Sequence, residues 1–145
     1  MPITTIPTRT ISDPASATDI NTLMANEKFL QGAKGFLISG DLTTSSTLAD
    51  VTVPCDIELA NIIFDVGTAV ATADMTIDVT YGTNPASKAT LFATTKPKIV
   101  NGATTSTDGV LTTTSLVARG HLTVTLSGTF TGAKNLTMWL VPVLT

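Results

Sequence analysis

Apolar and polar residues alternate along much of the chain between positions 51 and 143. The segment Met75–Tyr81 reads MTIDVTY and the segment Leu122–Leu126 reads LTVTL, so every second residue is apolar and most of the others are threonine. Successive side chains of a β-strand point to opposite faces, so this pattern predicts strands with one buried and one solvated face. Several such strands, separated by turn residues, predict an antiparallel sandwich or barrel.

Turn residues divide positions 33–145 into seven predicted strands and one weaker candidate. Glycine, asparagine, aspartate and proline gather between the apolar runs, as in Gly82–Pro85 and Asp108–Gly109. Strands of this number and spacing favour a mainly β, jelly-roll-like antiparallel sandwich. The strands are expected at Gly35–Leu42, Ile57–Val66, Met75–Tyr81, Thr90–Ala93, Leu111–Ala118, Leu122–Leu126 and Leu136–Val143, with Thr47–Val53 the weaker candidate.

The last predicted strand, Leu136–Val143, is apolar on both of its faces. Met138 and Leu140 would face the core, which places Trp139 and its odd-numbered neighbours on the opposite face. We expect that second face to be covered by the N-terminal part of the chain or by another subunit. Pro142 cannot donate a ladder hydrogen bond, which predicts that the strand ends at a sheet edge.

Residues 1–32 differ in pattern and form a separate predicted unit that precedes the sandwich domain of residues 33–145. Three prolines are spaced through residues 1–15, which predicts an extended arm. Residues 16–31 begin with capping residues and are followed by Gly32, which predicts one short helix of about four turns. Such a helix is marginal alone in water, so it would dock on the β domain or bundle with copies of itself.

Apolar residues in this N-terminal unit predict an assembly interface. A solvated tail would rarely carry so many aliphatic side chains, and we expect the arm to lie over a partner subunit. Together with the tryptophan of the last strand, the residues assigned to this interface are Ile3, Ile6, Ile11, Ile20, Leu23, Leu30 and Trp139.

Composition and charge argue against several classes of protein. Hydrophobic residues make up 43% of the 145 residues and charged residues 13%, which argues against a disordered chain. The net charge of −3 and the scattered lysines and arginines argue against nucleic-acid binding. No apolar run approaches the roughly 20 residues that span a bilayer, and the first residues do not predict a secretory signal. Threonine supplies about a fifth of the chain, enough to form either simple solvated faces or a surface that packs against a neighbour.

The residues that carry chemistry are few. Cys55 is the single cysteine, and its apolar surroundings predict a small buried side chain. His121 is the single histidine and is expected at an exposed turn. Asp65, Asp74 and Asp78 offer carboxylates for glycoside hydrolysis, but the aromatic residues that usually line a sugar cleft are scarce. We therefore predict a protein that is not an enzyme and uses no metal, nucleotide or other cofactor.

The chain resembles the small β-sandwich proteins of tailed-bacteriophage particles. The resemblance rests on the arm Ile3–Thr10 (ITTIPTRT), the short predicted helix from Ser16 and threonine-rich strands such as Leu122–Leu126. Proteins of that kind include capsid decoration (cement) proteins, head fibres and parts of tail fibres, often as trimers. The resemblance implies a homotrimeric virion protein on the capsid surface, made in the host cytoplasm. Its partners would be copies of itself and the major capsid protein or another virion protein, without nucleic acid or membrane.

The resemblance leaves two functions open. A capsid decoration protein would stabilise the head through its N-terminal arm and its subunit contacts, with the sandwich facing outward. The alternative is a tail- or head-fibre module that binds a host-surface glycan, in which Trp139 or Tyr81 would stack on a sugar. We favour the decoration protein because an interface or core position is the commoner place for both aromatic residues.

Overall fold

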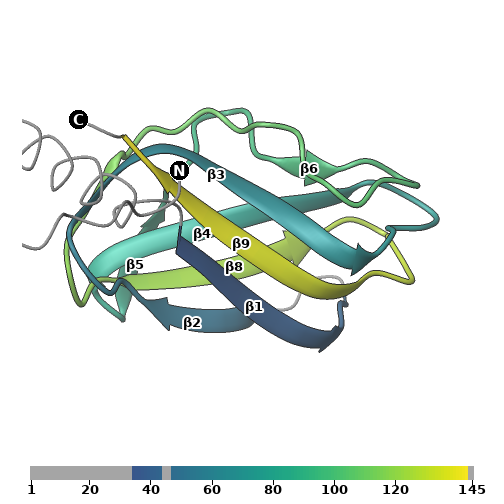
Figure 1. Ribbon diagram of the computed structural model, residues 1–145, viewed down its shortest axis with the longest axis horizontal. Helices are drawn as coiled ribbons and strands as arrows, with labels where there is room; N and C mark the ends of the chain where they lie inside the picture. Colours follow the sequence, from purple (N-terminus) through teal and green to yellow (C-terminus); the bar gives the residue numbers. More distant parts are fainter. Residues whose placement is uncertain (1–33, 44–46, 144–145) are drawn as a thin grey trace, which may run out of the picture. The chain divides into compact units, whose positions relative to one another are not determined.

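The computed structural model describes residues 34–43 and 47–143, which form nine β-strands in two antiparallel sheets (Figure 1). These ranges contain no α-helix, and hence none long and apolar enough to cross a membrane. The strands are β1 (Lys34–Asp41), β2 (Thr47–Thr52), β3 (Ile57–Thr68), β4 (Met75–Asn84), β5 (Ser87–Thr90), β6 (Lys98–Ile99), β7 (Ser115–Leu116), β8 (His121–Ser127) and β9 (Lys134–Pro142).

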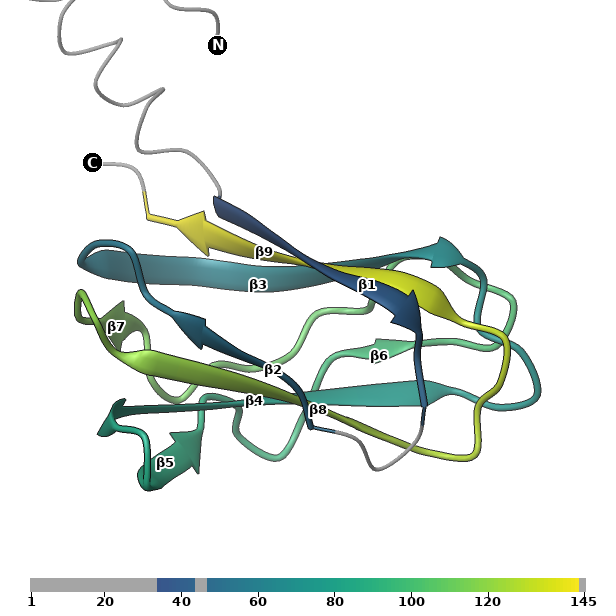
Figure 2. The same ribbon diagram turned by 90° about the horizontal axis from the view of Figure 1, so that it is seen from below.

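The two sheets form the two layers of a sandwich, seen edge-on in Figure 2. The first sheet has the order β1-β9-β3-β7, and the second has the order β2-β8-β4-β5, with β6 paired to the other end of β4. Because β1, β2, β3 and β4 lie alternately in the two sheets, each connection between them crosses from one layer to the other. The predicted antiparallel sandwich is confirmed. The finer jelly-roll assignment stays a prediction, which these crossing connections favour.

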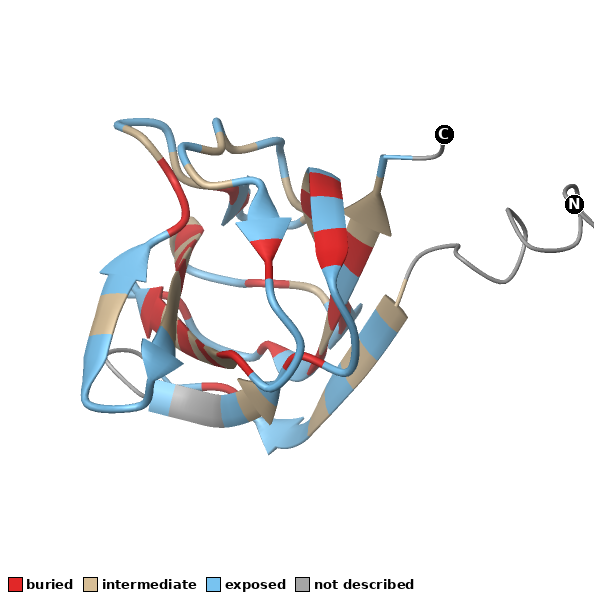
Figure 3. Cartoon of the chain, turned by 90° about the vertical axis from the view of Figure 1, so that its left-hand side faces the viewer, coloured by how far each residue is buried: buried red, intermediate tan, exposed pale blue. Residues whose placement is uncertain are grey.

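The core lies between the layers and is built from alternate residues of the long strands. Figure 3 shows buried residues alternating with intermediate or exposed ones along the strands. Burial of each large aliphatic or aromatic side chain contributes about 1.5–3 kcal/mol, so these positions dominate the stability of the fold. The central contributors from β3, β4, β8 and β9 are Ile62, Phe64, Val66, Met75, Ile77, Val79, Leu122, Val124, Leu126, Leu136, Met138 and Leu140.

Six of the predicted ranges, the weaker candidate included, fall on observed strands, whereas the two predicted from short apolar runs are displaced or shortened. The prediction for residues 90–93 overlaps β5 only at Thr90. In the range predicted as 111–118 only Ser115–Leu116 forms a strand, while Leu111 makes an isolated bridge to Phe92. Leu91 and Phe92 are consecutive and both buried, which a strand with alternating faces does not allow. The chain leaves the sheet there and enters the core, and β6 was not predicted because it is only two residues long.

The prediction that the last strand ends at a sheet edge is wrong, because β9 lies between β1 and β3. Pro142 is the last residue of β9 and lies two residues beyond Leu140, which pairs with the first residue of β1. On its other side it pairs with Leu59, next to an irregularity in the register. The missing N–H therefore falls beyond the described pairs of the ladder with β1, where a proline is tolerated at the end of a central strand.

The predicted arm and helix of residues 1–32 lie outside the described residues. The boundary between an N-terminal unit and a sandwich domain therefore stays a prediction. The same holds for six of the seven residues assigned to the assembly interface from the sequence, all except Trp139.

Candidate protein-interaction surface

The outer face of the first sheet carries apolar side chains that alternate with the core residues of β1, β9 and β3. Gly35, Trp139 and Ile63 lie side by side across the three strands, because Gly35 and Ile63 both pair with Trp139. Leu37 follows on β1 and Val141 on β9, on the same side of the sheet. We call the surface formed by Leu37, Ile63, Trp139 and Val141 the Trp139 face. Leu37 is 66% exposed and Trp139 is 38% exposed, so this face is accessible in the described domain.

Two contacts hold the indole of Trp139 flat on the sheet. A Cβ atom at position 35 would lie 2.7 Å from Cζ3 of the indole, so only glycine leaves room for the ring over β1. The indole Nε1 donates a hydrogen bond of 3.0 Å to Asp65 Oδ2, and Thr105 Oγ1 donates one of 2.7 Å to Asp65 Oδ1. The ring is thus fixed in position before any partner binds, which lowers the entropy cost of using it in an interface.

The opposite outer face, on the second sheet, is polar and internally paired. Thr80 lies opposite Thr123, and Asp78 lies opposite Thr125. Lys96 Nζ is 2.7 Å from Asp78 Oδ2 and neutralises this carboxylate. Ion pairs of this kind satisfy the charges of this face within the chain, and hydroxyl groups hydrogen-bond well to water, so the face needs no second protein to satisfy its polar groups.

The three carboxylates that the sequence offers for catalysis are not brought together as a pair. Asp65 lies on β3 in the first sheet, whereas Asp78 lies on β4 and Asp74 directly precedes β4 in the second sheet. Each is engaged separately: Asp65 holds Trp139, Asp74 Oδ2 accepts a hydrogen bond of 3.0 Å from Lys98, and Asp78 forms the ion pair described above. These contacts position an aromatic ring and neutralise charge, which are structural tasks.

Cys55 and His121 occupy positions that differ from the predicted ones. Cys55 is exposed, so the prediction of a buried thiol is wrong. Val53 and Ile57 are buried on either side of it, and the short connection from β2 to β3 turns outward between them. His121 is the first residue of β8 and is half-buried in the ladder with β2 and β4, so the expectation of an exposed position is wrong.

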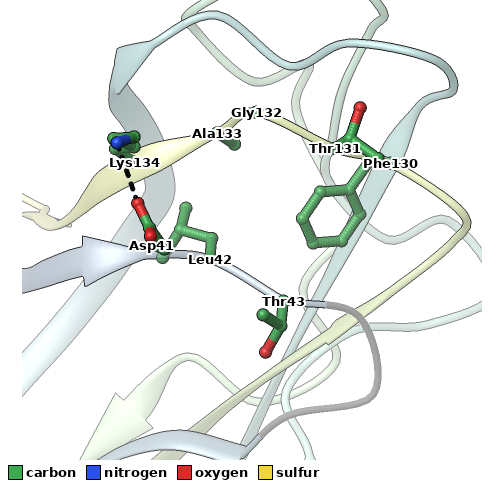
Figure 4. Close-up of a pocket in the computed structure, with 8 residues that line it drawn as sticks. All are labelled: Asp41, Leu42, Thr43, Phe130, Thr131, Gly132, Ala133 and Lys134. Carbon is green, nitrogen blue, oxygen red and sulfur yellow. Dashed lines mark ion pairs between the residues drawn. The ribbon is translucent and has the colours of Figure 1, made fainter.

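A shallow hollow lies where the chain leaves β1 and approaches β9, and it is lined by Asp41–Thr43 and Phe130–Lys134 (Figure 4). Leu42 and Phe130 are buried in its wall. Lys134 Nζ and Asp41 Oδ1 form an ion pair of 3.0 Å at its rim, so the two charges that border the hollow neutralise each other. Throughout residues 34–43 and 47–143, no three histidine, cysteine, aspartate or glutamate side chains gather in a way that could hold a metal ion.

Comparison with protein-family models, with curated proteins and with solved structures finds no match to this chain.

Among the residues that were assigned to an assembly interface from the sequence, Trp139 alone lies in the described part of the chain. The structure places it on an exposed face beside aliphatic residues. Leu37 and Ile63 were not assigned to that interface from the sequence. A signal for Leu37 exists, because it alternates with Phe36 and Ile38, which pack against the core. The sequence offers less for Ile63, since β3 is apolar over consecutive residues and does not reveal which of them faces outward.

Two aspartates outside the Trp139 face have a pKa below the ordinary value of 3.8. The hydrogen bond from Lys88 is the main cause that lowers the pKa of Asp50. The backbone N–H of Asn101, followed by the Lys98 ammonium, lowers the pKa of Asp74. In both cases the charged form is the one that makes the contact, so the folded state favours ionised carboxylates.

We expect the melting temperature to fall as the pH drops below about 4, partly because of these two groups. A folded-state pKa below the unfolded value stabilises the fold at higher pH, and this contribution disappears as the pH falls through the folded-state pKa. Calorimetry between about pH 5 and pH 2 should therefore show a shallower decline for the double variant Asp50→Asn/Asp74→Asn than for the wild type. Parallel declines in the two proteins would contradict this assignment.

Proposed function

We propose that this chain is a structural, non-enzymatic virion protein of the capsid-decoration type, which attaches to the particle through the Trp139 face. The observation that carries the proposal is an exposed tryptophan held flat between a glycine and a carboxylate and flanked by aliphatic side chains. Contiguous apolar side chains on the outer face of a sheet are a feature of surfaces that contact another protein.

The polarity of the two outer faces supports an oriented attachment. The second sheet presents hydroxyls and ion pairs, whereas the first sheet presents the Trp139 face. Burial of apolar surface is worth about 25 cal/mol per Å2 before the costs of association, so the first sheet gains most from contact with another protein. The second sheet loses least by remaining in water. A cement protein that covers a capsid surface needs such a division between a contact face and an outer face.

The placement of the acidic residues also supports a structural role. Asp65 serves to hold the indole, and its second oxygen accepts the Thr105 hydroxyl. Asp78 is neutralised by Lys96. A pair of carboxylates that hydrolyses a glycosidic bond requires two groups that flank one bond, one of them protonated, and these aspartates lie in different sheets.

A glycan-binding fibre module is the second function that the sequence left open, and the surroundings of Trp139 favour it less. Sugar recognition combines an aromatic platform with hydrogen-bonding groups around the rim of the sugar. The aliphatic neighbours of the indole are Leu37, Ile63 and Val141. Of the polar residues on the same face, Asp65 uses both of its oxygens for contacts within the chain. Asn61 likewise uses its amide nitrogen and oxygen, which leaves the hydroxyl of Thr137 near the ring. This chemistry fits an apolar protein surface better than a hydroxylated ligand.

The proposal is tested by asking whether the chain is part of a particle. Particles produced from the genome that encodes the chain would be purified on a density gradient and probed with an antibody against this protein. We expect the chain to migrate with the particles and to remain bound in about 1 M salt, because apolar contacts are not weakened by charge screening. A chain found only in the soluble fraction, with no band in the particle fraction, would refute the proposed function.

A further inference from the structure

The strand β1 forms one edge of the first sheet, and among the described residues it pairs with β9 alone (Figure 1). It is the longest edge strand of the described domain, with eight residues, and its interior, residues 35–40, carries no charge. Its regular pairing with β9 runs from Lys34 to Ile38, and the register shifts between Ile38 and Asp41, so the regular part of the edge is centred near Leu37. The other strands that pair on one side only are shorter: β7 has two residues, β6 has two including Lys98, β5 has four including Lys88, and β2 has six including Asp50. A long, uncharged edge offers backbone groups to another strand, and natural sheets usually protect such an edge.

Both faces of β1 are apolar at this edge. Leu37 is 66% exposed on the outer face. Phe36 and Ile38 pack against the core but remain partly exposed at the margin of the sandwich. A strand added beside β1 would cover residual apolar surface on both sides of the sheet as well as pairing the backbone.

We propose that β1 pairs antiparallel with β1 of a second copy of this chain, so that the first sheet continues across a two-fold axis. This axis keeps the outward-pointing residues of both copies on the outer face. An odd-numbered residue must therefore lie opposite an odd-numbered one, and an even-numbered residue opposite an even-numbered one. A register centred on Leu37 places it opposite Leu37 of the partner subunit and places Phe36 opposite Ile38 of the partner subunit. A register centred on Ile38 instead sets Leu37 opposite a serine and Phe36 opposite a glycine, which buries less apolar surface.

The charges of β1 favour the antiparallel direction. Its charged residues stand at its two ends, with Lys34 at the start and Asp41 at the finish. Antiparallel pairing brings each lysine toward the aspartate of the other copy, whereas parallel pairing would set like charges together. Asp41 is already paired with Lys134, yet its side chain is 75% exposed, so a second cation can approach it.

The pairing joins two Trp139 faces into one surface. Leu37 belongs to that face, and in the proposed register it lies at the two-fold axis between the two tryptophans. The dimer would attach to the particle through both Trp139 faces at once. Once the first face is bound, the second is held near the particle at a high effective concentration, which strengthens the overall binding. Two-fold pairing replaces the trimer implied by the resemblance, and it does not depend on the particle being a virion.

Disulfide trapping tests both the pairing and its register, with the full chain carrying Cys55→Ser to remove the exposed thiol. Directly opposite residues in an antiparallel pair have Cβ atoms about 4.5–5.5 Å apart, close to the span of a disulfide. A Leu37→Cys variant should therefore cross-link to a covalent dimer under mild oxidation. The matched control is Ser39→Cys on the same face, since the two Ser39 positions would lie about 13 Å apart in this register. Light scattering on the uncross-linked protein gives the oligomeric state, and Leu37→Lys should shift it to a monomer.

These experiments use no particle, so their outcomes test the pairing of β1 separately from the proposed function. A dimer that is trapped by Leu37→Cys, is not trapped by Ser39→Cys and is weakened at least tenfold by Leu37→Lys supports the pairing. A wild-type monomer at all concentrations overturns it, as does a trimer. A dimer that survives Leu37→Lys and resists trapping at position 37 also overturns it, while leaving particle attachment untouched.

Discussion

Replacing Phe64 by alanine is expected to lower the free energy of unfolding by about 3–5 kcal/mol. Phe64 is completely buried and lies opposite Met138 in the pairing of β3 with β9, the two central strands of the first sheet. Its removal leaves a cavity that the antiparallel ladder around it cannot collapse to fill. Domains of this size are stable by about 5–15 kcal/mol in total, so the loss would be a large fraction of the whole.

The measurement is chemical unfolding followed by circular dichroism, with Ile63→Ala as the matched control. Ile63 is the preceding residue of the same strand and points to the outer face, so its truncation should cost less than half as much. If Phe64→Ala fails to fold, Phe64→Leu gives a smaller loss in the same direction. Equal losses for positions 63 and 64 would mean that β3 is shifted by one residue, which exchanges its two faces.

Strict alternation alone predicts two of the strands. Met75–Tyr81 and Leu122–Leu126 have apolar residues at every second position, and both fall within observed strands, β4 and β8. Each is long enough for its pattern to outweigh local turn preferences, because one whole face must be buried at once. The expectation of an antiparallel sandwich followed from these segments and is confirmed.

The region between β5 and β8 could not be predicted because tertiary contacts decide its path. Leu91 and Phe92 are buried in succession, and the backbone N–H of Leu91 donates to Val79 of β4. The N–H of Thr112 donates in turn to the Leu91 carbonyl, so residues far apart in sequence stabilise an irregular segment. Hydrophobic runs of this length indicate burial but not strand pairing, and the single-sequence pattern contains no signal for the partner.

The candidate surface was predictable in part. Trp139 could be assigned to an interface because its strand is apolar on both faces. Its neighbours on the Trp139 face depend on strand order, since Gly35 and Ile63 reach it only because β9 lies between β1 and β3. The role of Asp65 was missed for the same reason, as it is 74 residues from the indole that it holds. A carboxylate considered for catalysis thus proves to position an aromatic ring.

Replacing Trp139 by alanine is expected to weaken binding to the particle by about 2 kcal/mol or more, which is about 30-fold. A large aromatic residue at the centre of an apolar face, fixed before binding, has the properties of an interface hot spot. Because the side chain lies outside the core, the variant should remain folded. The affinity would be measured by co-sedimentation of purified protein with particles that lack it, and circular dichroism would verify the fold.

A second variant separates the position of the indole from its presence. Gly35→Ala keeps Trp139 but places a Cβ atom 2.7 Å from Cζ3, so the ring must move away from β1. We expect a weaker affinity together with a changed fluorescence spectrum, which reports on this residue because Trp139 is the single tryptophan of the chain. Val117→Ala is the matched control, since Val117 is exposed but lies in the connection between β7 and β8, away from the Trp139 face. If Trp139→Ala and Gly35→Ala both bind as tightly as the wild type, attachment does not use the Trp139 face and must involve another surface.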